Sequence, residues 1–212
     1  MLCEAIERLY VADALLPDDE HPPAAFMPSA FMPTEFRIKW VTQDWEAREA
    51  HKLRRAVFCM EQGIFVGDDR DAVDERAQLL VALTCVAGMP DQVVGTVRIH
   101  NESTAAQPDL WYGSRLAVHA AFRKHGRLGA TLIRLAVTSA HALGCRTFLA
   151  HVQSQNTPLF RRLHWDTLAE ETLLGRPHTL MQADLAHYPP CFDPKSGFVT
   201  QSSTRAMGVA AQ

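Results

Sequence analysis

The chain has 212 residues, of which 47% are hydrophobic and 21% are charged. This length and composition predict one domain with a sizeable core. A formal net charge of −3 gives no electrostatic basis for binding nucleic acid. The five cysteines are scattered and lack the spacing of a metal site, so we expect reduced thiols and no bound metal.

Neither a membrane span nor an export signal is predicted. No apolar run approaches the length of about 18 residues that a spanning helix needs. The N-terminus lacks the basic region and apolar core of a secretory signal. We therefore expect a cytoplasmic protein without membrane contacts.

Two irregular segments are expected to flank one folded domain at residues 36–186. A short helix is expected near Glu4–Leu16, and five prolines follow before residue 34. Because proline disfavours both helices and central strands, residues 1–35 are predicted to form an arm. Residues 187–212 become polar and are predicted to form an irregular tail.

Hydrophobic periodicity predicts the elements of the domain in chain order. Its first half is expected to contain a strand, a helix and two more strands, at Phe36–Val41, Asp44–Gln62, Leu79–Val86 and Val93–Ile99. Its second half is expected to contain a strand ending at Val118, a helix from Leu128 to Leu143, a strand at Arg146–Val152, a short helix at Leu159–Leu163 and a strand at Thr179–Leu185. This order indicates an α/β protein with a mixed sheet flanked by helices.

The turn between the strand ending at Val118 and the next helix is the most informative segment. Unpaired N–H groups and the positive end of the helix dipole make such a turn suited to a phosphate or pyrophosphate. Gly126 permits close approach of a ligand to the backbone, and Arg123, Lys124 and Arg127 add positive charge. A helix that only needs a tight entry is the competing interpretation.

The pattern Arg123-x-x-Gly126-x-Leu128 resembles the Arg/Gln-x-x-Gly-x-Gly/Ala turn of the GNAT superfamily of N-acetyltransferases, which holds the pyrophosphate of coenzyme A. Here Leu128 stands where that family has Gly or Ala, and Gly129 follows one residue later. The order of strand, turn, helix, strand and short helix is also similar to the family. The resemblance implies a mixed, mostly antiparallel central sheet flanked by helices. It also implies acetyl-CoA or another acyl-CoA as cosubstrate.

The same resemblance implies which residues contact the cosubstrate. An N–H of the strand before the turn would polarise the thioester carbonyl, and Gln153 or its competitor Asn156 would contact the pantetheine arm. Phe160 stands where the family often has a tyrosine that meets the leaving thiolate. The implied set is Leu116, Ala117, Val118, Arg123, Lys124, Gly126, Arg127, Leu128, Gly129, Ala130, Gln153, Asn156 and Phe160.

The first half of the domain is similar to a bacterial N-acetyltransferase subgroup and to the acyl-homoserine-lactone synthases of the same fold. The synthases have a Glu three residues before the last arginine of their pattern, where this chain has Tyr112. We expect the matching residues to form a polar cleft of paired charges that opens next to residues 116–118 and receives the acceptor. They are Arg54, Phe58, Asp71, Asp74, Arg98 and Arg115, and Glu61 is expected in the same cleft.

Five residues are candidates for the general base that deprotonates the acceptor: Glu61, Asp74, Glu75, His119 and His151. Glu61 and His151 are favoured. Glu61 ends a helix, where the dipole raises the pKa of a carboxylate, and His151 lies on a strand expected to face the cleft. A solvated helix end and a satisfied core histidine are the competing interpretations.

We therefore predict an N-acetyltransferase that moves an acetyl group from acetyl-CoA to a small amine. An autoinducer-synthase-like acyltransferase is one alternative. A non-catalytic module that binds CoA or a partner is another, because of Phe160 and Leu128. A homodimer is one assembly that the sequence allows.

Overall fold

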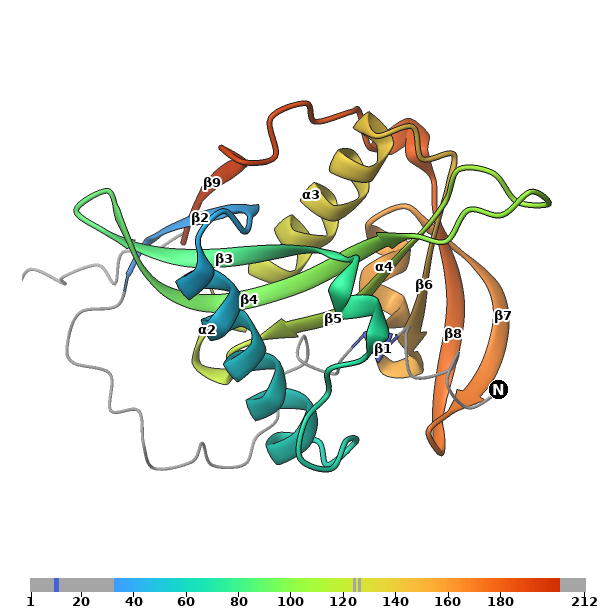
Figure 1. Ribbon diagram of the computed structural model, residues 1–212, viewed down its shortest axis with the longest axis horizontal. Coiled ribbons are helices and arrows are strands. Elements are labelled where there is room, and N and C mark those ends of the chain that lie inside the picture. Colours follow the sequence, from blue (N-terminus) through green and yellow to red (C-terminus); the bar gives the residue numbers. More distant parts are fainter. Residues whose placement is uncertain (1–9, 12–32, 124, 126, 203–212) are drawn as a thin grey trace, which may run out of the picture.

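The computed structural model of the protein describes residues 10–11, 33–123, 125 and 127–202. Most of the predicted arm therefore lies outside the described residues, as do Lys124 and Gly126 of the predicted phosphate turn. Nine strands form one mixed sheet in this part of the chain (Figure 1). In the described residues, no helix is long and apolar enough to cross a membrane.

Most neighbouring strands of the sheet run antiparallel, as the family resemblance implies. Their spatial order is β7 (Trp165–Leu173), β8 (Arg176–Ala183), β6 (Thr147–Gln153), β5 (Leu110–Val118), β4 (Met89–Asn101), β3 (Gln78–Val86), β2 (Glu35–Trp40) and β9 (Phe198–Gln201).

Helices cover both faces of the sheet. Helix α2 (Asp44–Arg55) lies in front of the sheet in Figure 1, and α3 (Leu128–Ala142) lies behind it. The short helix α4 (Thr157–Arg162) packs on the α3 side, where Phe160 meets the apolar core. The predicted fold class is therefore confirmed. Helix α2 packs on one face of the sheet, whereas α3 and α4 pack on the other.

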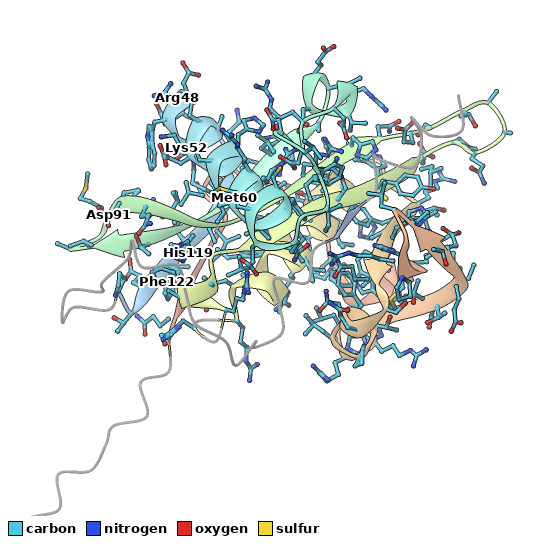
Figure 2. All side chains as sticks on the ribbon, turned by 90° about the horizontal axis from the view of Figure 1, so that it is seen from below. Arg48, Lys52, Met60, Asp91, His119 and Phe122 are labelled. Atoms are coloured by element: carbon cyan, nitrogen blue, oxygen red, sulfur yellow. The ribbon has the colours of Figure 1, made fainter. Side chains whose placement is uncertain are left out.

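The predicted first helix ends in a wider turn than expected. Residues Ala56–Glu61 form a π-helix after α2, and the N–H of Gln62 donates to the carbonyl of Val57 at 3.0 Å. Such π-helical turns occur often at functional sites. Arg48, Lys52 and the exposed Met60 lie along the outward side of this helical segment (Figure 2), so its opposite side faces the sheet.

Three strands are absent from the sequence-based prediction. Strand β7 forms a hairpin with β8 through Leu174 and Gly175, both of which have positive φ, the backbone of a tight hairpin turn. Strand β9 lies in the segment expected to be irregular and pairs with β2. Strand β1 (Tyr10–Val11) falls where a short helix was expected, so that expectation is wrong at these two residues.

Candidate functional site

Strands β5 and β6 run parallel but stay paired only at their beginnings. Their register joins Leu110–Tyr112 to Thr147–Leu149; beyond that, β5 remains paired with β4, and β6 with β8. Strand β1 pairs with His151 and Val152 of β6 and lies against β5 in the resulting opening (Figure 1). The carboxyl-terminal half of β5 therefore borders an opening in the sheet, which we call the β5–β6 opening.

The turn from β5 into α3 follows this opening directly. A left-handed residue, Arg127 (φ 51°), precedes the first helical residue, Leu128, which is buried. The Nε of Arg123 donates to the carbonyl of Val118 at 3.2 Å. Arg123 and Arg127, the described basic residues of the predicted phosphate turn, thus lie between the end of β5 and the N-terminus of α3.

Arg123 also holds Glu61 at the end of the π-helix. Its Nη2 is 2.6 Å from Oε2 of Glu61, whose side chain is 38% exposed. The sequence predicts Arg123 as a phosphate ligand and Glu61 as a base, but it does not predict that they pair. The carboxylate oxygens of Glu61 are thus occupied by a guanidinium, which makes this residue the weaker of the two favoured bases.

The remaining residues predicted to contact the cosubstrate are largely buried around the opening. Leu116, Ala117, Val118, Gly129, Gln153 and Asn156 are all buried, and Ala130 is half-buried. Phe160 is 2% exposed and meets Trp165 edge to face at 5.0 Å. Together with Leu116 and Ala150 it lines a cavity of about 20 Å³ with apolar walls on the α3 side of the sheet.

On the α2 side of the sheet, three arginines face three aspartates. Arg54 Nε lies 2.8 Å from Asp69 Oδ2, and Arg98 Nη1 lies 2.8 Å from Asp74 Oδ2. Arg115 Nη2 lies 3.1 Å from Asp71 Oδ2. We call this group the arginine–aspartate network; it consists of Arg54, Arg98, Arg115, Asp69, Asp71 and Asp74.

A β-bulge places Arg115 in this network. Thr96 pairs with Ala117 and Arg98 pairs with Ser114, so β5 has one more residue than β4 between these pairs. Arg115 has a φ of 55°, which is unusual for a residue other than glycine. Ser114 and Arg115 consequently both reach the α2 side, where Ser114 accepts a hydrogen bond from Arg98.

The network corrects the expectation of an open polar cleft at these positions. The three arginine side chains are at most 1% exposed, and the carboxylates are at most 11% exposed. Burial works to raise the pKa of Asp74, but Arg54 and Arg98 outweigh it and hold that pKa well below its usual range. Burial and the like charge of Arg98 lower the pKa of Arg115 to about 10, so it remains charged at neutral pH.

Next to the network, aromatic side chains stack across three strands on the same sheet face. The ring of Tyr112 on β5 lies 6.0 Å from His100 on β4 and 6.3 Å from His151 on β6. The interplanar angles are 20° and 9°. We call His100, Tyr112 and His151 the histidine–tyrosine stack. Nδ1 of His151 lies 2.9 Å from Oε2 of Glu171 on β7.

Titratable groups in and beside this stack are shifted by burial. Burial lowers the pKa of His151, and the carboxylate of Glu171 opposes that effect. Burial likewise lowers the pKa of His178 on β8 and raises that of Tyr112. His151 is therefore a neutral imidazole at pH 7, able to accept a proton.

A family model described as the acetyltransferase (GNAT) family matches residues 37–165. The chain belongs to the GNAT acetyltransferase family. A Bacillus subtilis (strain 168) protein named as a candidate acetyltransferase is 27% identical over 146 residues, which cover 68% of this chain and 93% of that protein.

Two solved structures show the same GNAT fold at low identity. An acyl-CoA N-acyltransferase from Pseudomonas aeruginosa has a TM-score of 0.55 at 18% identity, covering 70% of this chain and 98% of that one. BjaI, a CoA-dependent acyl-homoserine lactone synthase solved with SAM and isopentyl-CoA, has a TM-score of 0.55 at 16% identity, covering 69% and 82%. The resemblance to GNAT proteins and to the synthases is thus confirmed at the level of family and fold.

The other predicted residues of this GNAT protein lie around the two clusters. Phe58 is buried, and its ring lies 6.0 Å from the guanidinium of Arg115. Glu75 is exposed beside the network. The Nδ1 of His119 accepts a hydrogen bond from the N–H of Ala121 at 3.3 Å, and burial and Arg123 lower the pKa of His119. In the described residues, no three His, Cys, Asp or Glu side chains are placed to hold a metal ion.

Sequence reasoning missed Asp69, His100, Glu171 and His178. Asp69 belongs to an acidic loop in which no spacing separates it from its neighbours. Glu171 lies on β7, an edge strand whose largely exposed, polar sequence gives no clear alternation. The histidines could have been found from their apolar strand context, but only strand pairing brings them to one place.

Proposed function

We propose that the protein is an acyl-CoA-dependent N-acyltransferase that moves an acetyl group from acetyl-CoA directly to a small amine. One observation carries the proposal: the β5–β6 opening lies between His151 on one side and the basic turn into α3 on the other. A thioester that displaces β1 from that opening would have its phosphates near Arg123 and Arg127 and its carbonyl near residues 116–118. Membership of the GNAT family supports this placement.

The proposed reaction requires few groups from the chain. A backbone N–H of residues 116–118 would polarise the thioester carbonyl. His151 would take a proton from the acceptor ammonium, and the free amine would attack the carbonyl carbon. The carbon–sulfur bond then breaks, and coenzyme A leaves as a thiolate. Phe160 has no proton to donate, so water would carry the remaining excess proton from the new amide nitrogen to that thiolate.

The space around the opening favours a short acyl chain. The cavity behind it, lined by Leu116, Ala150 and Phe160, has a volume of only about 20 Å³. That volume is comparable to one water molecule or a methyl group, not to a long acyl chain. Acetyl transfer is therefore favoured over the longer chains of an autoinducer-synthase-like enzyme.

The rim of the site favours a small acceptor. Arg176, at the β7–β8 hairpin, donates to the carbonyl of Gln62 after the π-helix at 2.7 Å. This contact joins the end of the π-helix to the β7–β8 hairpin, whose Glu171 lies beside His151. Asp71 and Asp74 are paired with arginines, so neither is a good candidate to meet a cationic amine.

Calorimetric titration with acetyl-CoA, followed by thiol release with a panel of amines, tests the proposal. Arg123→Gln should weaken acetyl-CoA binding by about 1–2 kcal/mol, the contribution of a charge-assisted hydrogen bond. Arg146→Gln, at an arginine whose side chain is 84% exposed, should leave binding unchanged.

Three outcomes would contradict parts of this proposal. Absence of acetyl-CoA binding would refute the cosubstrate. Binding without amine-dependent thiol release would favour a non-catalytic module. Faster release from long-chain acyl-CoA than from acetyl-CoA would favour the synthase-like alternative.

A further inference from the structure

Glu171 and His151 meet across an intervening strand. In the sheet order β7-β8-β6, β8 separates their strands, and Glu171 pairs with His178 while His151 pairs with Leu180. Strands two places apart are separated by about 9–10 Å, so only long side chains can bridge them. Here Oε2 of Glu171 and Nδ1 of His151 are 2.9 Å apart, which is an ion-pair distance, although Nδ1 is not aligned for a hydrogen bond.

We propose that Glu171 is the positioning residue of His151: it holds Nδ1 on the β7 side and leaves Nε2 to accept the acceptor's proton. This inference rests on the proposed function, in which His151 is the base. A neutral imidazole has one N–H, and a carboxylate beside Nδ1 keeps that hydrogen there. When Nε2 takes the proton, the same carboxylate stabilises the resulting cation.

The surroundings of His151 support a fixed imidazole. Tyr112 stacks on one face at 6.3 Å and is itself backed by His100. From β8, His178 is the titratable neighbour, and from β7 it is Glu171. Of these four residues, only Glu171 has a carboxyl group.

A purely structural role is the weaker explanation for Glu171. Its side chain is 32% exposed on an edge strand, and ion pairs with such exposure contribute little to stability. The imidazole that it contacts, in contrast, is only 11% exposed and lies beside the β5–β6 opening. The pair is therefore better placed to orient a base than to hold the edge strand.

The test compares Glu171→Gln with Glu170→Gln, which removes the neighbouring exposed carboxylate of β7. The His151 imidazole is titrated by NMR, and the pH dependence of kcat is measured with acetyl-CoA and an accepted amine. In Glu171→Gln we expect both midpoints to move to lower pH, because the charge that raises the pKa of His151 is lost. We also expect kcat to fall about 10- to 100-fold, with the KM for acetyl-CoA unchanged. Glu170→Gln should match the wild type.

The NMR arm does not depend on turnover, so it separates the two proposals. If the wild type turns over no amine, the proposed function fails, and a His151 titration unchanged by Glu171→Gln would overturn the pairing as well. If the wild type is active and Glu171→Gln keeps its kcat and pH profile, the positioning role is refuted. Equal losses of kcat in Glu171→Gln and Glu170→Gln would indicate that kcat depends on the overall surface charge of β7. That result would also refute the positioning role.

Discussion

On the α2 side of the sheet, two polar groups lie next to each other and differ in what they can still do. In the arginine–aspartate network, every guanidinium faces carboxylates, and the side chains are almost entirely buried. In the histidine–tyrosine stack, Glu102 lies 3.3 Å from His100, and Glu171 lies 2.9 Å from the neutral imidazole of His151 beside the β5–β6 opening. The first group has the larger number of charges, whereas the second can change its protonation near neutral pH.

This difference teaches that charged residues brought together by a fold are not thereby a binding site. Within the network, Arg115 Nη1 and Asp69 Oδ1 are buried without a hydrogen-bond partner, and the other charged atoms are paired among themselves and fix the backbone around them. Here the network holds the bulge at Arg115, the start of the acidic loop and the end of α2 together. We interpret it as the wall of the acceptor site and the stack as its reactive part.

Removing one arginine of the network should produce the largest effect on stability. Arg98→Met leaves Asp71 and Asp74 buried without one of their partners, which should lower the free energy of unfolding by about 3–5 kcal/mol. Urea denaturation measures this value. Arg48→Met, on the outward side of α2 (Figure 2), should change it by less than about 0.5 kcal/mol. A similarly small loss of the free energy of unfolding in both variants would contradict the pairing of Arg98 with Asp71 and Asp74.

Acid should act on the same network. The pKa values of Asp71 and Asp74 are lowered from 3.8 in the folded protein despite burial, because Arg98 and Arg54 interact with them. Near pH 3–4 the unfolded chain therefore binds more protons than the folded one. The contribution of the network to stability should be constant above about pH 5 and fall steeply below pH 4. Arg98→Met should show a shallower fall, and identical acid curves would contradict this prediction.

Phe160→Tyr should produce an intermediate effect on stability. The ring of Phe160 is buried against Trp165, beside a cavity with apolar walls. A new hydroxyl there would be desolvated without a partner, at a cost of about 1–3 kcal/mol. Thermal unfolding should show this loss without any gain in thiol release. A stable and faster variant would instead place residue 160 beside the leaving sulfur.

Arg176→Ala should have the smallest effect, confined to the acceptor. Loss of the hydrogen bond to Gln62 releases the β7–β8 hairpin from the π-helix. The KM for a small amine should rise a few-fold, which corresponds to about 1 kcal/mol. The kcat/KM for larger amines should increase relative to that for the small amine. Acetyl-CoA affinity should not change. An unchanged amine preference would mean that this contact does not border the acceptor.

The order of elements from β2 to β8 could largely be predicted, because buried strands and amphipathic helices leave periodic signals. The helix from Leu128 and the strand ending at Val118 were predicted within a few residues. Strands β7 and β9 could not be predicted, since edge strands with exposed faces lack that signal. The π-helical end of the first helix depends on tertiary contacts, which leave no periodic trace.

The candidate site was predicted only in part. Five charged residues of the network were predicted to converge, but their pairing also depends on Asp69 and on the bulge at Arg115. Residues far apart in sequence, such as His151 and Glu171, meet only through strand order. Residues whose side chains can take part in the reaction can thus be proposed from the sequence, whereas the residues that they contact are known only from the fold.

The most direct test of the central claim compares wild type and His151→Asn in acetyl-CoA binding and in amine-dependent thiol release. If the stack is the reactive part of the site, His151→Asn should bind acetyl-CoA with unchanged affinity and release thiol about 100-fold more slowly, the usual loss on removing a general base. Undiminished thiol release in a folded His151→Asn protein would contradict the claim.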